Sequence, residues 1–546
     1  MTTIQVVMDN RHAKFIRPYP WEQLRELFAY QPPGWRFMPK VKMGLWDGFI
    51  RCLRYDKVPT GLFLAMKDEV EKKLGVQFSI ENKCLPVLFR PINDGDERDY
   101  QLKCVAAMKQ AAQTGGGLVL CATGTGKTRM AGMFLKSLIG QAVFVVDELT
   151  LLEQARQELH QVTGEEIGVV GHSEFRPQRI TVATIQTLHL HQRRIDFVRW
   201  VKTLDVMIID EIHVMLNRRQ DAVVESIRPF AVFGLTATLP LQQTHTAMRA
   251  YALTGPVIFS YSLEQGTTEG HLTSGVVVQL SVPSLEDFKK EVWTDAYRRC
   301  VIQNVKRNAA VEQLTRAVLA ENRSAILLVE WIGHLKEFSR RLKDIPHRLV
   351  YGAVEVEDRM AAKQDFDAKE VKLIITNKVF KKGVNLRAVD CIIDAAGLKS
   401  KTDCIQKFGR GVRLAEGKIA LAYFDIADTL GRHGEASDSR YKAFHKQGIK
   451  VYQVPYEEKL LPRIVQRAIQ LANIRGIDNA KKVDQKKTKV RRRAEKRQGA
   501  PASHRHESHS EDPAVSMEAG MGGVQATATG YADVDRRGRL VSGGSM

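Results

Sequence analysis

The chain has 546 residues, of which 44% are hydrophobic and 26% charged, a length and composition that predict a globular protein of roughly three or four domains. Its formal net charge of +20 favours a polyanionic partner, and nucleic acid is the first candidate because affinity for it comes largely from neutralised phosphates. Seven scattered cysteines give no indication of a zinc site, and no apolar run approaches the ~18 residues of a membrane span, so we expect a cytoplasmic protein without membrane contact.

Residues 1–92 predict a separate small α+β domain, with a helical pattern over residues 21–30. Its densest feature is segment 35–54, where Trp and Phe are interleaved with basic residues, a composition that suits nucleic-acid phosphates and bases. The alternative, which residue types alone favour, is that Trp46, Phe49 and Leu53 are core and the charges form a solvated face. The candidate DNA-binding residues are Arg36, Lys40, Lys42, Trp46 and Arg51.

Residues 93–262 predict an α/β lobe built around a phosphate loop. A short apolar strand and a helix flank Cys-Ala-Thr-Gly-Thr-Gly-Lys-Thr at 121–128, although Cys121 stands where the phosphate-loop pattern requires Gly. The glycines let successive N–H groups and the helix N-terminus point at phosphates, while Lys127 reaches the β and γ oxygens and Thr128 holds Mg²⁺. The nucleotide-binding candidates in this loop are Thr123, Gly124, Thr125, Gly126, Lys127 and Thr128.

Other motifs of this lobe fit nucleotide hydrolysis. A predicted strand ends in Asp210-Glu211-Ile-His213, where Asp210 would complete the Mg²⁺ shell and Glu211 would polarise the attacking water. The alternative for this motif is an acidic strand end in a solvated turn. Tyr100 and Gln101 could stack on and hydrogen-bond an adenine edge, or simply begin a helix. The lobe closes with Thr236-Ala-Thr238, which would relay between the nucleotide site and a bound strand, or would be a plain strand exit.

Residues 263–312 are more polar and predict a linker with a connecting helix, and residues 313–475 predict a second α/β lobe without a phosphate loop. The second lobe contains Gln406 and, further on, Arg410 and Arg413. Two arginines three residues apart lie on one helix face and suit a single γ-phosphate, the arrangement of an arginine finger. A surface pair of ion-paired arginines is the alternative.

Residues 476–546 predict a disordered basic tail, because Lys/Arg clusters followed by Ser, His, Gly and Ala cannot bury enough apolar surface to fold. Residues 481–497 contain ten Lys/Arg and two acidic residues. This cluster therefore accounts for +8 of the net charge and leaves +12 for the rest of the chain.

Taken in order, Tyr100-Gln101, 122–128, 210–213, 236–238, Thr376 with Gly383, and 406–413 resemble the ordered motifs of superfamily 2 helicases, over about residues 93–455. The resemblance implies two RecA-like lobes with ATP and Mg²⁺ between them and nucleic acid across their tops. Lys127, Thr128, Asp210 and Glu211 would come from one lobe and Arg410 and Arg413 from the other, with Gln406 near the nucleotide and its attacking water. The chain departs from the family at 147–149, where many members have Pro-Thr-Arg, and at Asn385, where many carry a carboxylate.

Residues 30–37 and 44–51 resemble the N-terminal domain of the phage UvsW-type helicases, which remodel branched DNA. This resemblance implies an ATP-dependent DNA helicase or translocase that unwinds or branch-migrates branched, duplex or single-stranded DNA in replication, recombination or repair. It would act in the cytoplasm of a bacterial host. The alternatives are an RNA-stimulated superfamily 2 helicase, whose motor motifs would be the same, and a DNA-binding scaffold with a weak ATPase.

Overall fold

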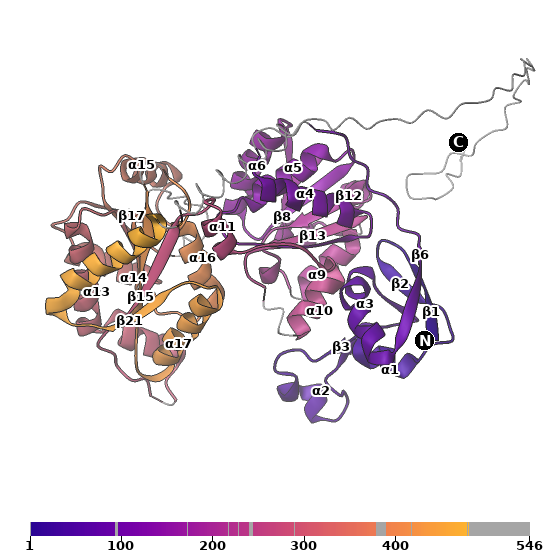
Figure 1. Ribbon diagram of the computed structural model, residues 1–546, viewed down its shortest axis with the longest axis horizontal. Coiled ribbons are helices and arrows are strands. Elements are labelled where there is room, and N and C mark those ends of the chain that lie inside the picture. The colour runs from indigo at the N-terminus through magenta and orange to yellow at the C-terminus, as the bar shows by residue number, and fades with distance from the viewer. Residues whose placement is uncertain are drawn as a thin grey trace, which may run out of the picture. The chain divides into compact units, whose positions relative to one another are not determined.

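The structure is a computed structural model that describes residues 2–92, 97–171, 173–216, 218–227, 229–239, 244–288, 290–377, 389–415, 418–477 and 479 (Figure 1). Residues Met1–Val483 form one compact unit. Apart from residues 476, 477 and 479, the predicted disordered tail lies outside the described residues, as do Gly383 and Asn385.

The first domain is the predicted small α+β domain. Its sheet has the strand order β5-β2-β1-β6, in which β1 is parallel to β6 and antiparallel to β2. Aromatic side chains, including Phe15, Phe28 and Phe63, fill the core. A short pair of strands, β3 and β4, flanks residues 31–49, which include most of the basic and aromatic segment. The elements are β1 (Thr2–Met8), β2 (His12–Phe15), α1 (Trp21–Leu27), β3 (Ala29–Tyr30), η1 (Trp35–Phe37), α2 (Pro39–Lys42), β4 (Ile50–Arg51), β5 (Lys57–Pro59), α3 (Thr60–Leu74) and β6 (Val76–Asn82).

The first domain shares its core with the lobe that follows. Met248, on helix α10 of that lobe, is buried among the core residues of the first domain. Gly61 lies at the start of α3, where an added Cβ would come within 2.4 Å of the Tyr251 carbonyl oxygen. Backbone therefore meets backbone at this point, and the two parts are packed together without a gap.

The second part is a sheet with the strand order β10-β9-β11-β8-β12-β13-β7-β14, parallel apart from β10. Apolar cores lie on both faces, one beneath α4 to α6 and the other beneath α7 to α10. The strands are β7 (Gly116–Cys121), β8 (Gln141–Val146), β9 (Ile167–Gly171), β10 (Glu174–Arg176), β11 (Ile180–Thr184), β12 (Leu204–Ile209), β13 (Ala231–Thr236) and β14 (Val257–Tyr261). The helices are α4 (Asp99–Ala112), α5 (Lys127–Ser137), α6 (Leu149–Thr163), α7 (Ile185–Leu190), α8 (Ile195–Val201), η2 (Ile212–Val214), α9 (Arg218–Ile227) and α10 (Thr244–Leu253).

The third part is a parallel sheet with the strand order β17-β18-β16-β19-β20-β15-β21 and an apolar core on each face. Its strands are β15 (Ser274–Ser281), β16 (Ala325–Leu328), β17 (His347–Val350), β18 (Leu373–Thr376), β19 (Cys391–Asp394), β20 (Ala420–Ala427) and β21 (Val451–Pro455). Its helices are α11 (Leu263–Thr268), α12 (Trp293–Tyr297), η3 (Arg298–Ile302), α13 (Val305–Ala320), α14 (Ile332–Arg341), α15 (Val356–Asp367), α16 (Lys401–Gly411), α17 (Gly431–Lys446), η5 (Glu458–Leu460) and a last helix over 461–477.

The predicted fold of two parallel α/β lobes after a small α+β domain is therefore confirmed, with one difference. The segment 263–312, expected to be a linker, contains β15, which lies between β20 and β21 in the second parallel sheet. The strand was not predicted because polar residues lie on both sides of its short buried run, Val276, Val277 and Val278. No helix within the described ranges is long and apolar enough to cross a membrane.

Candidate nucleotide site

The phosphate loop connects β7 to α5 as predicted, and both of its glycines have the backbone conformation that glycine tolerates best. Gly124 has φ +90° and Gly126, which caps α5, has φ +81°. Cys121 is the buried last residue of β7 and has no positive φ, so the Gly that the pattern requires at this position is dispensable here. Lys127 and Thr128 form the first turn of α5, where the helix N-terminus favours an anion.

Tyr100 is not placed as the prediction of adenine stacking requires. Its ring is stacked on the ring of Tyr261, with centroids 4.1 Å apart, and lies 4.8 Å from the ring of His271. Its hydroxyl donates a hydrogen bond to the Thr125 carbonyl oxygen at 2.6 Å. Tyr100 therefore supports the phosphate loop from behind, whereas Gln101 lines the cavity beside it.

Asp210 and Glu211 follow the carboxyl end of β12, next to the phosphate loop. Glu211 has φ +46°, an uncommon conformation for a residue with a Cβ and one that recurs at functional sites. Its Oε1 lies 3.6 Å from Lys127 Nζ, and its Oε2 accepts a hydrogen bond of 3.2 Å from the Thr236 hydroxyl. His213 Nδ1 lies 2.8 Å from the same hydroxyl and 3.3 Å from Glu211 Oε2.

The two neighbouring carboxyl groups have pKa values shifted in opposite directions. Burial and the charge of Glu211 raise the pKa of Asp210, and the charge of Lys127 opposes this only in part. Burial also acts to raise the pKa of Glu211, but Lys127 and the hydrogen bonds from His213 and Thr236 outweigh it and lower that pKa. Glu211 is therefore the carboxyl group of the pair that is held as a carboxylate.

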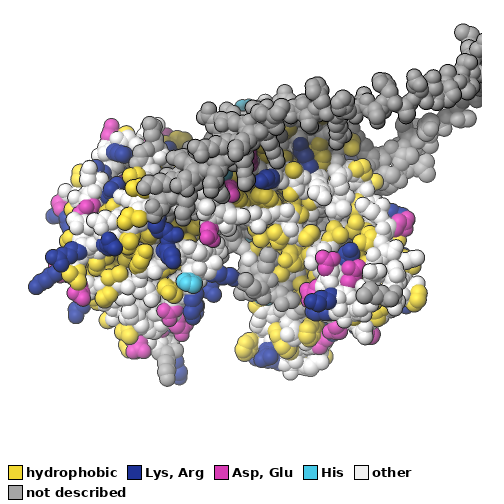
Figure 2. All heavy atoms as spheres, viewed as in Figure 1, with side chains coloured by type: hydrophobic (Ala, Val, Ile, Leu, Met, Phe, Trp, Pro, Cys, Tyr) yellow, Lys and Arg dark blue, Asp and Glu magenta, His cyan; other side chains and the backbone are white. Residues whose placement is uncertain are grey.

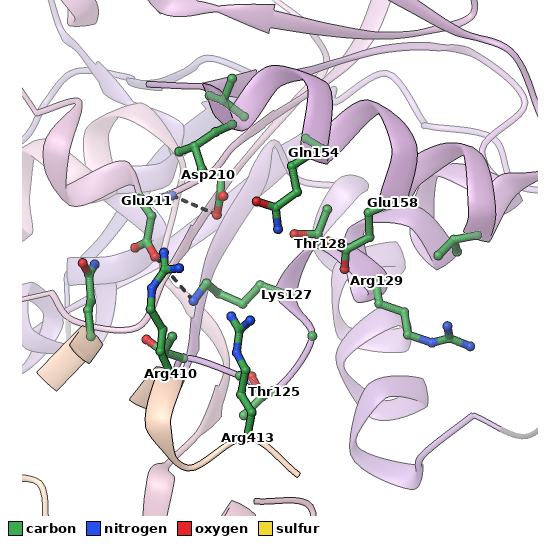
Figure 3. A pocket seen from close by; sticks show the side chains of 18 of the residues that line it. Thr125, Lys127, Thr128, Arg129, Gln154, Glu158, Asp210, Glu211, Arg410 and Arg413 are labelled. Carbon is green, nitrogen blue, oxygen red and sulfur yellow. Dashed lines mark hydrogen bonds and ion pairs between the residues drawn. The ribbon is translucent and has the colours of Figure 1, made fainter. Parts of the chain in front are cut away.

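The second lobe contributes α16 to the same cavity, which has a volume of about 1040 Å³. Arg410 and Arg413 point from this lobe toward Lys127 and Glu211 (Figure 3). Burial and the charge of Arg413 lower the pKa of Arg410 to about 10, so Arg410 stays charged at neutral pH. The predicted site residues that line the cavity are Gln101, Thr123, Gly124, Thr125, Gly126, Lys127, Thr128, Asp210, Glu211, Gln406, Arg410 and Arg413.

Glycine also explains how closely α16 approaches the phosphate loop. A Cβ added to Gly409 would come within 2.7 Å of Thr123 Cβ, and one added to Gly411 within 2.6 Å of Leu421 Cδ2. A Cβ on Gly124 would lie 3.1 Å from Arg413 Cγ. The lack of a side chain at Gly409 therefore lets α16 approach the phosphate loop, whereas the lack of one at Gly411 lets the helix pack on β20 of its own lobe.

Several residues that line the cavity were missed by the sequence analysis, among them His213, Asp403 and His271. His213 was within a recognised motif, but its contacts with Glu211 and Thr236 could not be read from spacing. Asp403 lies in the first turn of α16, before the motif that was recognised. His271 follows α11, within the segment expected to be a linker, and no pattern marked it.

The basic and aromatic segment of the first domain lies on the surface. Arg36, Lys40 and Lys42 are exposed on η1 and α2, and Phe37 retains 78% of its accessible surface. Figure 1 shows α2 standing away from the four-stranded sheet of this domain. On the face shown in Figure 2, Lys and Arg side chains are interspersed with acidic and apolar ones and form no single continuous basic patch.

The two other predicted DNA-binding residues, Trp46 and Arg51, are held within the domain. Arg51 forms ion pairs with Glu26 at 2.9 Å and Asp47 at 2.7 Å, which occupy its guanidinium group. Trp46 is half-buried and its indole N–H donates to the Phe49 carbonyl oxygen at 2.9 Å. Half-buried Trp46 fits the alternative in which the aromatic residues are core. The exposed Arg36, Lys40 and Lys42 fit both that alternative, in which the charges form a solvated face, and the DNA-binding hypothesis.

Three family models match the chain in succession. "DNA helicase UvsW, N-terminal" matches residues 20–80, "Type III restriction enzyme, res subunit" matches 94–241, and "Helicase conserved C-terminal domain" matches 306–415. Each of the three parts of the fold is thus matched by a different model.

Two curated relatives agree with these models. The chain is 22% identical to the ATP-dependent DNA helicase UvsW of Enterobacteria phage T4, over 80% of this chain and 94% of the relative. It is 22% identical to the DNA 3'-5' translocase XPB2 of Sulfurisphaera tokodaii, over 64% of this chain and 86% of the relative. The crystal structure of T4 UvsW matches with a TM-score of 0.40 and 16% identity, over 84% of this chain and all of that one.

A further solved structure supports the fold. The Type ISP restriction-modification enzyme LlaBIII, solved bound to DNA, matches with a TM-score of 0.50 and 14% identity, over 70% of this chain and 33% of that one. The two parallel lobes are the RecA-like lobes that the sequence predicted. Helicase families of this kind use ATP, normally with Mg²⁺. These matches support an ATP-dependent DNA helicase that resembles superfamily 2 helicases and, among them, the phage UvsW-type helicases.

Proposed function

We propose that this helicase hydrolyses ATP in the cavity between the phosphate loop and α16, and that it unwinds or branch-migrates branched DNA in replication, recombination or repair. One observation carries the first part of the proposal. Lys127 and Glu211 from the first lobe line the same cavity as Arg410 and Arg413 from the second. Groups of both charges, supplied by two lobes, thus surround a space large enough for a nucleotide.

The donor set fits a Mg²⁺–nucleotide. Gly124 and Gly126 open the loop toward the first turn of α5, and the hydroxyl of Thr123 is buried without a hydrogen-bond partner among the described residues. Thr128 and Asp210 would supply the hydroxyl and carboxylate oxygens that Mg²⁺ prefers. When bound, ATP supplies the phosphoanhydride that is hydrolysed, and the metal ion neutralises charge on its β and γ oxygens.

Each charged side chain then has a distinct role. Lys127 Nζ lies 3.6 Å from Glu211 Oε1 in this structure. With ATP bound, Lys127 would bind the phosphates and its ion pair with Glu211 would weaken. Glu211, oriented by Thr236 and His213, would accept a proton from the attacking water. Arg410 and Arg413 would stabilise negative charge that develops on the transferred phosphoryl group, and Gln406 would orient the water.

Adenine recognition involves Gln101 and not the Tyr100 ring. The side chain of Gln101 lines the cavity, and its Oε1 accepts a hydrogen bond of 3.3 Å from the Arg98 backbone N–H. Its amide group could therefore be fixed in one orientation by its own helix before it meets a base edge. Tyr100 would contribute indirectly, because its hydroxyl holds the Thr125 carbonyl oxygen of the phosphate loop.

The DNA substrate is proposed from the first domain. Residues 20–80 match the N-terminal model of a DNA helicase, and the surface of this range exposes Arg36, Lys40 and Lys42 beside Phe37. Cations of this kind bind phosphates without reading sequence, and an exposed ring can stack on an unpaired base. A branch point offers both duplex phosphates for the cations and unpaired bases for the ring.

ATPase stimulation tests the proposal and its alternatives in one experiment. Single-stranded DNA, linear duplex, a four-way junction and RNA are compared at saturating concentration. We expect the four-way junction to give the largest kcat. Equal or greater stimulation by RNA would favour an RNA-stimulated helicase, and no stimulation by any of the four would favour a DNA-binding scaffold with a weak ATPase.

A further inference from the structure

Two buried carboxylates lie side by side at the carboxyl edge of the parallel sheet of the second lobe. Asp394 ends β19, and its register partner on β20 is Asp425. Both are almost fully buried, with 2% and 0% of their surface exposed. Like charges so close in a protein interior are costly unless each has its own counter-charge.

Each carboxylate is bound by a cation from a different helix. Lys407, on α16, places its Nζ 2.9 Å and 2.7 Å from the two oxygens of Asp394. Arg440, on α17, donates to Asp425 at 2.8 Å. Asp394 also accepts a hydrogen bond of 2.7 Å from the Tyr423 hydroxyl. The two ion pairs therefore connect two neighbouring helices to two neighbouring strands.

Other contacts also hold α16 to its lobe. At its C-terminal end the Thr273 N–H and hydroxyl donate to the Val412 carbonyl oxygen at 2.8 Å and 2.9 Å, and along its buried face the contacts are apolar. Cys404, Phe408 and Val412 pack into the core beneath the helix. Such contacts hold the helix down but tolerate small sliding and rotation, since they have no preferred direction. The Lys407–Asp394 ion pair adds a stronger constraint, because both side chains are buried and their separation would leave an uncompensated charge in the interior.

Lys407 lies directly between the groups that face the cavity. Gln406 precedes it, and Arg410 follows by three residues, about 4.5 Å along the helix axis. We propose that Lys407 is a positioning residue: by binding Asp394 it sets the rotation and axial register of α16, and so holds Gln406 and Arg410 at the nucleotide. This inference rests on the proposed function, in which Arg410 acts during phosphoryl transfer.

The structure offers a matched control for testing the proposal. Asp428 is buried to the same degree as Asp394, with 3% of its surface exposed, and it binds Arg307 at 3.0 Å. Its partner Arg307 belongs to α13, which contributes no residue to the cavity lining. Asp394→Asn and Asp428→Asn are therefore the same substitution at equal depth in one lobe, each breaking an ion pair to a different helix.

The experiment measures DNA-stimulated kcat, KM for ATP and the melting temperature of the full chain. We expect both variants to have a lower melting temperature than wild type. Only Asp394→Asn should lower kcat, by on the order of 10- to 100-fold, with KM changed less than threefold, because misplacing a catalytic group by about 1 Å costs roughly that factor. Equal kcat losses in both variants, or no loss in Asp394→Asn, would overturn the positioning role.

Two further variants keep every outcome interpretable. Tyr423→Phe is the substitute if Asp394→Asn does not fold, since it removes one hydrogen bond from Asp394 without changing charge. It should lower kcat by about 3- to 10-fold, and an unchanged kcat would overturn the proposal.

Arg410→Ala separately tests the proposed role of Arg410, on which the role of Lys407 rests. A normal kcat in Arg410→Ala would refute the proposed role of Arg410, whereas a reduced kcat there with a normal kcat in Asp394→Asn would refute only the role of Lys407.

Discussion

Lys127 Nζ lies 3.6 Å from Glu211 Oε1, so the cation of the phosphate loop is paired with the carboxylate that would activate water. Because a nucleotide phosphate would compete with Glu211 for the same ammonium group, filling the loop and freeing the carboxylate are linked events. Loss of the Lys127 charge from beside Glu211 would also raise the pKa of that carboxylate and make it a stronger base.

This relationship predicts that substitutions of Lys127 and of Glu211 have different effects on ATP binding and on hydrolysis. Lys127→Ala should weaken ATP binding and abolish hydrolysis, since the phosphates lose their counter-charge. Glu211→Gln should bind ATP at least as tightly as wild type, yet lose on the order of 10²-fold or more in kcat. Titration with a fluorescent ATP analogue, together with steady-state ATPase assays, separates the two effects. Near-normal DNA-stimulated turnover in Glu211→Gln would contradict the assignment.

The arginines of the second lobe should affect turnover without affecting DNA binding. Arg410→Ala or Arg413→Ala removes charge from the cavity, and we expect kcat to fall by about 10²-fold or more. DNA affinity measured without nucleotide should stay within about threefold of wild type, because neither substitution touches the exposed segment of the first domain. A parallel loss of nucleotide-free DNA binding would instead identify these side chains as phosphate contacts on DNA.

The close approach of Gly409 to the phosphate loop predicts a steric effect. Gly409→Ala places a methyl group where Thr123 Cβ would be only 2.7 Å away, so α16 must retreat from the loop. We expect kcat to fall by roughly tenfold or more, with the melting temperature little changed because the clash lies at the cavity and not in a core. Gly333→Ala on α14 is the control, since its added Cβ would meet nothing within 4 Å.

Charge reversal in the first domain should affect branched substrates selectively. Lys40→Glu with Lys42→Glu changes two exposed side chains of α2, so the melting temperature should match wild type. Unwinding of four-way junctions should fall by about tenfold or more, while ATPase on single-stranded DNA stays near normal. Lys72→Glu with Lys83→Glu makes the same charge change elsewhere on the domain and should have little effect. Unimpaired junction unwinding in the α2 variant would remove the basis for branch recognition.

Point substitutions are preferable to deletion of the whole first domain. Met248 of α10 is buried within the core of that domain, so removing residues 1–92 would expose apolar surface on the first lobe. A truncated protein could then lose every activity together through instability. Such a result would say nothing about DNA recognition.

The basic cluster at 481–497 should add affinity without specificity. The helix over 461–477 is packed, and the Ser274 hydroxyl donates to the Arg475 carbonyl oxygen at 3.3 Å, so the cleanest truncation comes after Val483, where the compact unit ends. This truncation removes eight of the ten Lys/Arg of the cluster, and it should make the slope of log K against log salt shallower on every DNA tested. An unchanged slope would show that these charges do not contact DNA.

The parts of the site that were predictable from sequence are those formed by consecutive residues. The phosphate loop was recognisable because its glycines, Lys127 and Thr128 form one short run whose geometry is local. The surroundings of Tyr100 were not recognisable, since its stacking partner Tyr261 lies far along the chain. The ion pairs of Arg51 with Glu26 and Asp47 depend on how β4 meets α1, which no spacing reveals.

The overall architecture was predictable for a related reason. Alternating strands and helices determine a parallel sheet almost wherever they occur, because the connections are short and of one hand. The exception was β15, whose place in the middle of the second sheet is set by its pairing with β20 and β21 and not by its neighbours in sequence. Buried ion pairs such as Lys407 with Asp394 were also out of reach, since each partner alone resembles a surface charge.

The shared core of the first domain and the first lobe gives the molecule a fixed mechanical reference. Because backbone meets backbone where Gly61 approaches Tyr251, the domain cannot slide on α10 without a collision. A DNA arm gripped by α2 would consequently be anchored to the lobe that carries the phosphate loop. Any displacement of the second lobe during hydrolysis would then move the DNA strand bound by that lobe relative to the arm held by the first domain.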